Sequence, residues 1–105
     1  MKENYVYPAR MEFVDGNYRV RFIDFPDMTC DEEPTKKEVL ESARESLVLK
    51  ILESLDNGEE LPKPTESEED VIYIHIWLPY YRNSAKEIYV KKNVTIPSKL
   101  DMEAK

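Results

Sequence analysis

Few side chains in this sequence could carry out chemistry, and they lie far apart along the chain. Asp24, Asp27 and Asp70 have the carboxylates that hold divalent metal ions in nucleases. Asp24 and Asp27 flank a proline turn, where aspartate is favoured for local backbone hydrogen bonds, and Asp70 ends an acidic stretch. The sequence therefore favours structural roles for these residues and predicts neither a metal site nor a cofactor.

His75 and Cys30 are the only histidine and the only cysteine. His75 lies in an apolar stretch with no Ser, Cys or Asp at a spacing that is typical of a catalytic triad. Cys30 cannot form an internal disulfide and has no partner histidine nearby in the sequence. We expect a hydrogen-bonded imidazole within a sheet or interface and a small buried or turn cysteine, and no catalytic residue.

Two groups of side chains are candidates for binding a partner protein rather than for catalysis. Aromatic residues are concentrated near the end of the last apolar stretch, and aromatics are enriched in the centres of protein interfaces. An acidic run precedes the same stretch. The predicted partner or oligomer contacts are Trp77, Tyr80, Tyr81, Glu66, Glu68, Glu69 and Asp70, whereas Tyr73 fits core packing equally well.

The charge balance favours a protein partner over nucleic acid for the body of the domain. Twenty-two acidic residues against fifteen basic ones give a formal net charge of −7, which opposes binding to phosphate backbones. A basic partner is the better electrostatic match, although solubility alone also accounts for an acidic composition. The length of 105 residues suits one domain with a short tail.

Alternating apolar residues predict a β-hairpin at the start of the chain. Tyr5, Tyr7, Ala9, Met11 and Phe13 would share one face of a strand. Asp15-Gly16-Asn17 tolerates positive φ and precedes a second alternating stretch, with Tyr18, Val20 and Phe22 inward. A short third strand is expected at 28–30. Pro8 cannot donate a ladder hydrogen bond, so its nitrogen must point away from a neighbouring strand, or the strand must be an edge there.

One long helix is predicted in the middle of the chain. Thr35 and Glu38 have the spacing of a capping box, and apolar residues then recur at three- and four-residue steps as far as Leu55. Asn57-Gly58 suits a left-handed cap, and the prolines that follow prevent the helix from resuming. The spacing gives about six turns.

The stretch 71–78, VIYIHIWL, is apolar on both faces, as expected for a central strand or for one at an oligomer interface. Because one helix covers one face well, either 79–90 folds over the other face or a second subunit does, and we favour a homo-oligomer. The run is too short to span a membrane, and the first residues lack the apolar core of a signal peptide. We therefore expect a cytoplasmic protein without membrane contact.

The order of these pieces resembles the HicB antitoxin family: a hairpin, FPD, a capped helix that ends in NG, a proline-rich link, an apolar strand and YR-x-x-A-K. The pieces that carry the resemblance are YPARMEF, YRVRFIDFPD, PTKKEVLESARESLVLKILESLDNGEELPKPT, VIYIHIWLPYYRNSAKE and KKNVTIPSKLDMEA. Family members usually read LPGC after FPD and then have a longer turn with a glycine, whereas 28–33 here contains no glycine. The turn should therefore have a different shape.

The resemblance implies an α+β fold, a partial ribonuclease-H-like β-β-β-α-β domain over residues 1–90, with a short C-terminal extension. It also implies that the chain binds a HicA-like toxin, a small ribonuclease that cleaves messenger RNA. Family members commonly carry a C-terminal module that binds the operator of their own operon. Residues 91–105 resemble the beginning of a ribbon-helix-helix of that kind, with Lys91, Lys92, Asn93 and Thr95 as DNA-binding candidates.

The sequence thus predicts a non-catalytic antitoxin that inhibits a HicA-like toxin, associates into a dimer or tetramer, and binds operator DNA only if its C-terminal module is completed. Two alternatives stay open at this point. One is a divalent-metal nuclease on a ribonuclease-H-like fold, and the other is an orphan dimeric interaction module. Fifteen residues hold fewer than half the elements of a ribbon-helix-helix, so 91–105 is a fragment or a degenerate module.

Overall fold

The hairpin forms from two alternating strands joined by a two-residue turn. In the computed structural model, which describes residues 3–66 and 69–92, β1 spans Asn4–Val14 and β2 spans Asn17–Phe22. The turn residues have positive φ, 52° at Asp15 and 85° at Gly16. This geometry matches the twist of the flanking strands, so the predicted hairpin is confirmed.

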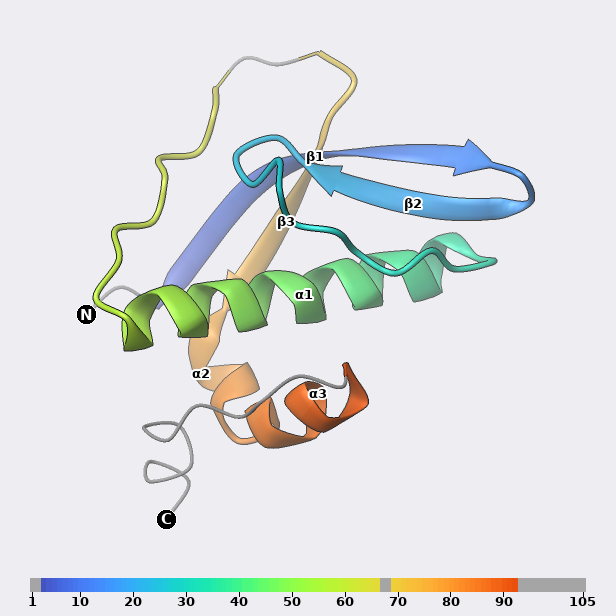
Figure 1. Ribbon diagram of the computed structural model, residues 1–105. Helices are drawn as coiled ribbons and strands as arrows, with labels where there is room; N and C mark the ends of the chain where they lie inside the picture. Colours follow the sequence, from blue (N-terminus) through green and yellow to red (C-terminus); the bar gives the residue numbers. More distant parts are fainter. Residues whose placement is uncertain (1–2, 67–68, 93–105) are drawn as a thin grey trace.

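The third strand comes from the end of the apolar stretch. β3 (Ile72–Trp77) pairs antiparallel with the first half of β1, and β2 pairs with its second half, which gives the strand order β2-β1-β3. Of the two alternatives for 71–78, a central strand is therefore wrong, because β1 is central and β3 is an edge strand, whereas a strand at an oligomer interface stays a prediction (Figure 1). β1 reaches both neighbours because it is 11 residues long.

Pro8 lies inside this central strand without breaking the sheet. The carbonyl of Pro8 accepts a hydrogen bond from the backbone N–H of Ile23 at 3.2 Å, just past the end of β2. The nitrogen and the carbonyl of a strand residue point to the same side, so the nitrogen of Pro8 also faces the place where β2 has ended. The proline costs the sheet no hydrogen bond with β3.

The segment between β2 and the long helix differs from the prediction. No strand forms at 28–30, and the predicted third strand there is wrong; the segment is tied to β2 by one bridge between Tyr18 and Glu33. Met28 and Cys30 are partly buried against the core, so their side chains, together with this single bridge, hold the segment. The observed order is β-β-α-β-α-α, an α+β fold as expected.

Helix α1 (Lys36–Asp56) has the predicted start and end. The hydroxyl of Thr35 accepts from the backbone N–H of Glu38 at 3.2 Å and donates to the carboxylate of that residue at 2.8 Å. Gly58 has a φ of 69° after the last turn, a conformation that glycine adopts without strain. The helix is buried on more than one side because it contacts β2, β3 and α3.

Two short helices follow β3: α2 (Leu78–Arg82) and α3 (Ala85–Lys91). They lie on the same side of the sheet as α1, and their residues Leu78, Ile88 and Tyr89 join its core (Figure 1). Residues 79–90 therefore do not cover the other face of β3. That outer face carries no helix in the described part of the chain.

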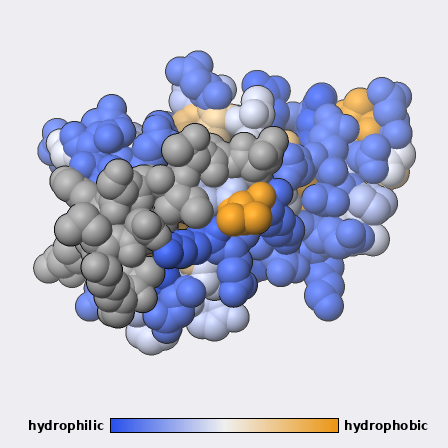
Figure 2. Space-filling model, turned by 60° about the horizontal axis from the view of Figure 1, so that its bottom comes forward, coloured by the Kyte–Doolittle hydropathy of each residue, from blue (hydrophilic) through white to orange (hydrophobic). Residues whose placement is uncertain are grey.

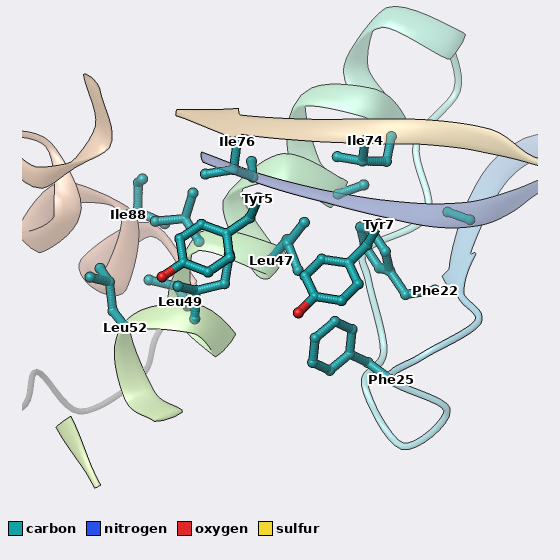
Figure 3. Packing of buried hydrophobic residues seen from close by; sticks show 14 of the residues in the cluster. Tyr5, Tyr7, Phe22, Phe25, Leu47, Leu49, Leu52, Ile74, Ile76 and Ile88 are labelled. Atoms are coloured by element: carbon teal, nitrogen blue, oxygen red, sulfur yellow. The ribbon is translucent and has the colours of Figure 1, made fainter. Parts of the chain in front are cut away.

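The core lies between the sheet and the helices. Tyr5 and Tyr7 project from β1 toward Leu47 and Leu49 of α1, and Phe25 packs edge-on to the ring of Tyr7 with centroids 4.8 Å apart (Figure 3). The β3 residues Ile74 and Ile76 complete this inner layer. Among the described residues, no helix is long and apolar enough to cross a membrane.

Candidate protein-binding surfaces

The outer face of the sheet has an aromatic half and a charged half. Over β1 and β3, Tyr73 and Trp77 are 56% and 52% exposed, and Val6 is 40% exposed. His75 lies between the two aromatics, paired with Val6 across the strands, and its Nε2 is 3.3 Å from Oδ1 of Asn4. The alternation of β3 thus buries its isoleucines and presents an uncharged aromatic row to solvent.

The charged half lies over β1 and β2. Arg19 is 3.3 Å from Glu12, and Arg21 is 3.8 Å from the other oxygen of the same carboxylate. Arg10 is the partner of Arg21 across the strands and is exposed. This half of the sheet is therefore more basic than the chain as a whole, and it differs in kind from the aromatic half.

The two tyrosines that were predicted as interface residues have different surroundings. Tyr80 is 69% exposed, whereas Tyr81 is partly buried and meets the ring of Tyr80 edge-on at 5.0 Å. Burial raises the pKa of Tyr81, with a smaller opposing effect from the positive charge of Arg44. Trp77 and Tyr80 are therefore available to a partner, and Tyr81 is mostly a packing residue.

The acidic connector after α1 is held against the body of the molecule at two points. The hydroxyl of Tyr7 donates to the carbonyl of Pro62 at 2.7 Å, and Thr65 is bound by Asp24. Beyond these anchors, Glu66, Glu69 and Asp70 are exposed. The remaining predicted residue of this group, Glu68, lies outside the described residues.

Asp24, the first of the candidate metal ligands, is committed to this tether. Its two carboxylate oxygens accept hydrogen bonds from the hydroxyl and the backbone N–H of Thr65, at 2.5 and 3.0 Å. Nowhere in 3–66 and 69–92 do three His, Cys, Asp or Glu side chains come together in a way that could hold a metal ion. The carboxylate that a nuclease mechanism would need therefore has a structural task.

A cleft of about 400 Å³ opens beside the last turns of α1, and sequence analysis did not foresee it. Four carboxylates, those of Asp24, Asp27, Glu59 and Glu60, line the cleft with a single cation, Lys50, and the rest of the lining is mostly apolar. Two parts of the chain that are far apart in the sequence, 24–28 and 50–62, build the cleft, which is why no local pattern signals it. Its rim adds exposed negative charge next to the acidic connector.

Cys30 lies in the segment that precedes α1, and its side chain packs against the core. The thiol is partly buried, and this burial raises its pKa above the ordinary value. A protonated thiol is a poor nucleophile at neutral pH. The structure therefore places Cys30 as a packing residue, as the sequence suggested.

The two described lysines of the predicted DNA-binding group contact acidic side chains of the domain. Lys91, in α3, is 3.1 Å from Glu45 of α1. Lys92 is only 10% exposed and binds Asp31 at 2.9 Å and the hydroxyl of Ser42 at 2.7 Å. The hydrogen bond and charge of Lys92 lower the pKa of Asp31. Asn93 and Thr95 lie outside the described residues, and DNA binding by this group stays a prediction.

The side of the molecule on which α2 and α3 lie is largely hydrophilic. Turned so that this side faces the reader, the surface is mostly blue, with scattered apolar residues (Figure 2). Val90, in α3, is one large apolar residue that is exposed, at 69%. The described residues thus present an acidic connector and cleft rim, a hydrophilic helical side and an uncharged aromatic row on the sheet.

The comparisons with known proteins agree with a binding protein. Residues 6–81 match the family model of HicB-like antitoxins of bacterial toxin-antitoxin systems. A search of curated proteins finds no match. The matched residues run from β1 into α2 and so include the sheet, α1 and the acidic connector. Since the match covers well over half of the chain, the protein belongs to the HicB-like antitoxin family.

Proposed function

We propose that this chain is the antitoxin of a toxin-antitoxin pair and that it silences a HicA-like, mRNA-cleaving toxin by binding to it. The observation that carries the proposal is the family match over residues 6–81. The antitoxin acts in stoichiometric amounts in the cytoplasm and makes or breaks no bond. Its effect is to cover the RNA-binding surface of the toxin.

Electrostatics supports this mode of inhibition. A ribonuclease that binds RNA needs a positively charged surface, and the exposed carboxylates of the antitoxin compete with phosphates for it. Glu59 and Glu60 at the cleft and Glu66, Glu69 and Asp70 of the connector give residues 59–70 an excess of exposed carboxylates, although Lys63 interrupts them. The anchors at Pro62 and Thr65 hold the part of the connector between Glu60 and Glu66 against the domain, so the toxin does not have to order that part on binding.

Asp24 argues against the nuclease alternative because both of its carboxylate oxygens already accept hydrogen bonds from Thr65. Operator binding is not part of the proposal. Lys91 and Lys92 hold the end of α3 to Glu45 and Asp31, and base contacts by either lysine would require these ion pairs to break.

The test combines the purified chain with the small basic protein encoded beside it. We expect a complex in pull-down and calorimetry and loss of the toxin's RNA cleavage at equimolar antitoxin. The chain alone should cleave no RNA with magnesium or manganese. RNA cleavage by the chain that Asp24→Asn abolishes, or unchanged toxin activity with excess antitoxin, would falsify the proposal.

A pair of matched variants tests the acidic surface. Glu59→Gln/Glu60→Gln/Glu66→Gln removes three carboxylates from the proposed contact, and Glu3→Gln/Glu32→Gln/Glu87→Gln removes three exposed carboxylates elsewhere. We expect the first variant to bind toxin at least about tenfold more weakly at low salt, and the second within about twofold of wild type. Equal losses would show that net charge, rather than this surface, determines binding.

A further inference from the structure

We propose that β3 pairs with β3 of a second copy of this chain, antiparallel about a two-fold axis, so that two three-stranded sheets join into one of six strands. β3 lies at the sheet edge, and its ladder partner is β1. On its other side, the described part of the chain supplies no strand (Figure 1). The backbone groups on that side can therefore pair with another chain.

The sequence of β3 lacks the residue types that usually keep an edge strand from pairing. Native edge strands are usually protected by charged side chains, proline, bulges or a covering segment. Ile72–Trp77 contains no charged residue, proline or glycine. The opposite edge of the sheet differs, because β2 carries Arg19 and Arg21 and is bridged to Glu33. Of the two edges, β3 is the one suited to an intermolecular contact.

The side chains of β3 are complementary to a second copy of themselves. A two-fold axis perpendicular to the sheet leaves the outer faces of both copies on the same side of the joined sheet. Residues that oppose one another across the two strands must therefore come from the same face. If the axis passes through the pair of His75 residues, Tyr73 of each copy lies opposite Trp77 of the other copy. On the inner face, Ile74 lies opposite Ile76. Every opposed pair around the central His75 pair is then aromatic with aromatic or aliphatic with aliphatic, the pairings that stabilise antiparallel sheets.

The charges at the ends of β3 also favour an antiparallel second copy. Glu69 and Asp70 precede the strand, whereas Arg82 and Lys86 follow it. Antiparallel pairing brings the acidic end of each strand toward the basic end of the other. With a net charge of −7 per chain, two copies repel one another over most of their surface, and β3 is a place where they meet without opposed carboxylates.

The same charges distinguish this surface from the one proposed for the toxin. A basic toxin finds carboxylates at the cleft and the connector and none within Ile72–Trp77. The contact continues beyond the strand, since Tyr80 is 69% exposed at the start of α2. This matters because a stable interface covers roughly 800 Å² per partner, more than two six-residue strands supply. The aromatic row and Tyr80 enlarge the contact.

The first test measures the mass of the full chain in solution, without toxin. We expect a dimer of twice 12.4 kDa by light scattering at micromolar concentration. His75→Lys places two ammonium groups on the axis and should weaken the dimer at least about tenfold, because like charges opposed across strands are destabilising. Phe13→Lys is the control, since Phe13 is 61% exposed at the other end of β1. Circular dichroism checks that both variants fold.

The second test measures the register by disulfide cross-linking in a Cys30→Ser background. A residue on the axis faces its own copy at a Cα separation of about 4.5–5.5 Å, which lies within the range of roughly 4.4–6.8 Å that a disulfide spans. His75→Cys should therefore cross-link on oxidation, and Tyr73→Cys should cross-link at least about tenfold more slowly. A monomeric wild type, a His75→Lys dimer as tight as the Phe13→Lys dimer, or equal cross-linking at 73 and 75 would overturn the proposal.

Discussion

Asp24 holds Thr65 through both of its carboxylate oxygens, at 2.5 Å from the hydroxyl and 3.0 Å from the backbone N–H. The two residues are 41 positions apart in the sequence. This pair fixes the acidic connector against the end of the hairpin, next to the cleft at the C-terminal end of α1. A residue type that suggests a metal ligand in the sequence thus acts as a structural tether.

Removal of the tether should lower stability. We expect Asp24→Ala to reduce the free energy of unfolding by about 1–3 kcal/mol, because charge-assisted hydrogen bonds are lost and the N–H of Thr65 loses its acceptor. Thr65→Val keeps the shape and the N–H and should cost less, about 1 kcal/mol. Urea unfolding measures both. The double variant should be no worse than Asp24→Ala, and additive losses would contradict direct coupling.

The partly buried Lys92 should couple stability to acid pH through Asp31. Lys92 lowers the pKa of Asp31 in the folded state, so the pair contributes stability above the unfolded pKa of aspartate, about 3.9. That contribution is lost as the pH falls through the lower, folded pKa. Lys92→Met removes the partner, and its stability deficit at pH 7 should shrink toward pH 2.

Unfolding curves at several pH values between 2 and 7 check this prediction. The effect will be modest, because the side chain of Asp31 is 64% exposed and solvent screens the pair. Lys37→Met is the matched control, since Lys37 is an exposed lysine in the first turn of α1. A deficit in Lys92→Met that is the same at every pH would show that the lysine acts only through packing.

The capping hydroxyl of Thr35 should account for a measurable part of the stability of α1. It accepts from the N–H of Glu38 at 3.2 Å, so Thr35→Ala leaves that donor to solvent. We expect a loss of about 1 kcal/mol in the free energy of unfolding, and Thr35→Ser should restore most of it. Thr29→Ala, at an exposed position before the helix, should stay within about 0.5 kcal/mol of wild type.

Tyr89 offers a substitution that should stabilise the protein. Its ring is 3% exposed, and its hydroxyl has no hydrogen-bond partner within the described residues. Burial, with the nearby charges of Glu53 and Asp56, raises the pKa of Tyr89 to about 12. Tyr89→Phe removes a buried polar group without changing the shape of the ring. We expect equal or higher stability at pH 7, by up to about 1 kcal/mol.

The dependence of stability on pH in the alkaline range gives an independent check of the role of Tyr89. Because the folded state holds this proton more tightly than the unfolded chain, stability must fall between about pH 10, where the unfolded group ionises, and about pH 12. Thermal unfolding of Tyr89→Phe should show a smaller loss over this interval than wild type. A loss of equal size would mean that the hydroxyl of Tyr89 is solvated in the folded protein.

Local patterns in the sequence determined the hairpin, α1 and the burial of alternate residues in each strand. The turn at Asp15-Gly16 and the cap at Thr35 involve residues within a few positions of one another, and their geometry follows from backbone sterics and nearby hydrogen bonds. The order of motifs was enough to indicate the HicB-like family, and the family match confirmed it. What could be predicted was therefore short-range in the chain.

Tertiary structure decided which strand is the edge and which charges are available. The apolar stretch around Ile74 looked central because both of its faces are apolar, yet β1 is long enough to pair with both neighbours, which leaves β3 outside. The sequence suggested a structural role for Asp24 and DNA binding for Lys92, but only the fold shows that Thr65 and Asp31 are the groups these side chains contact. Such contacts join residues tens of positions apart, and packing of the whole chain, not a local pattern, selects them.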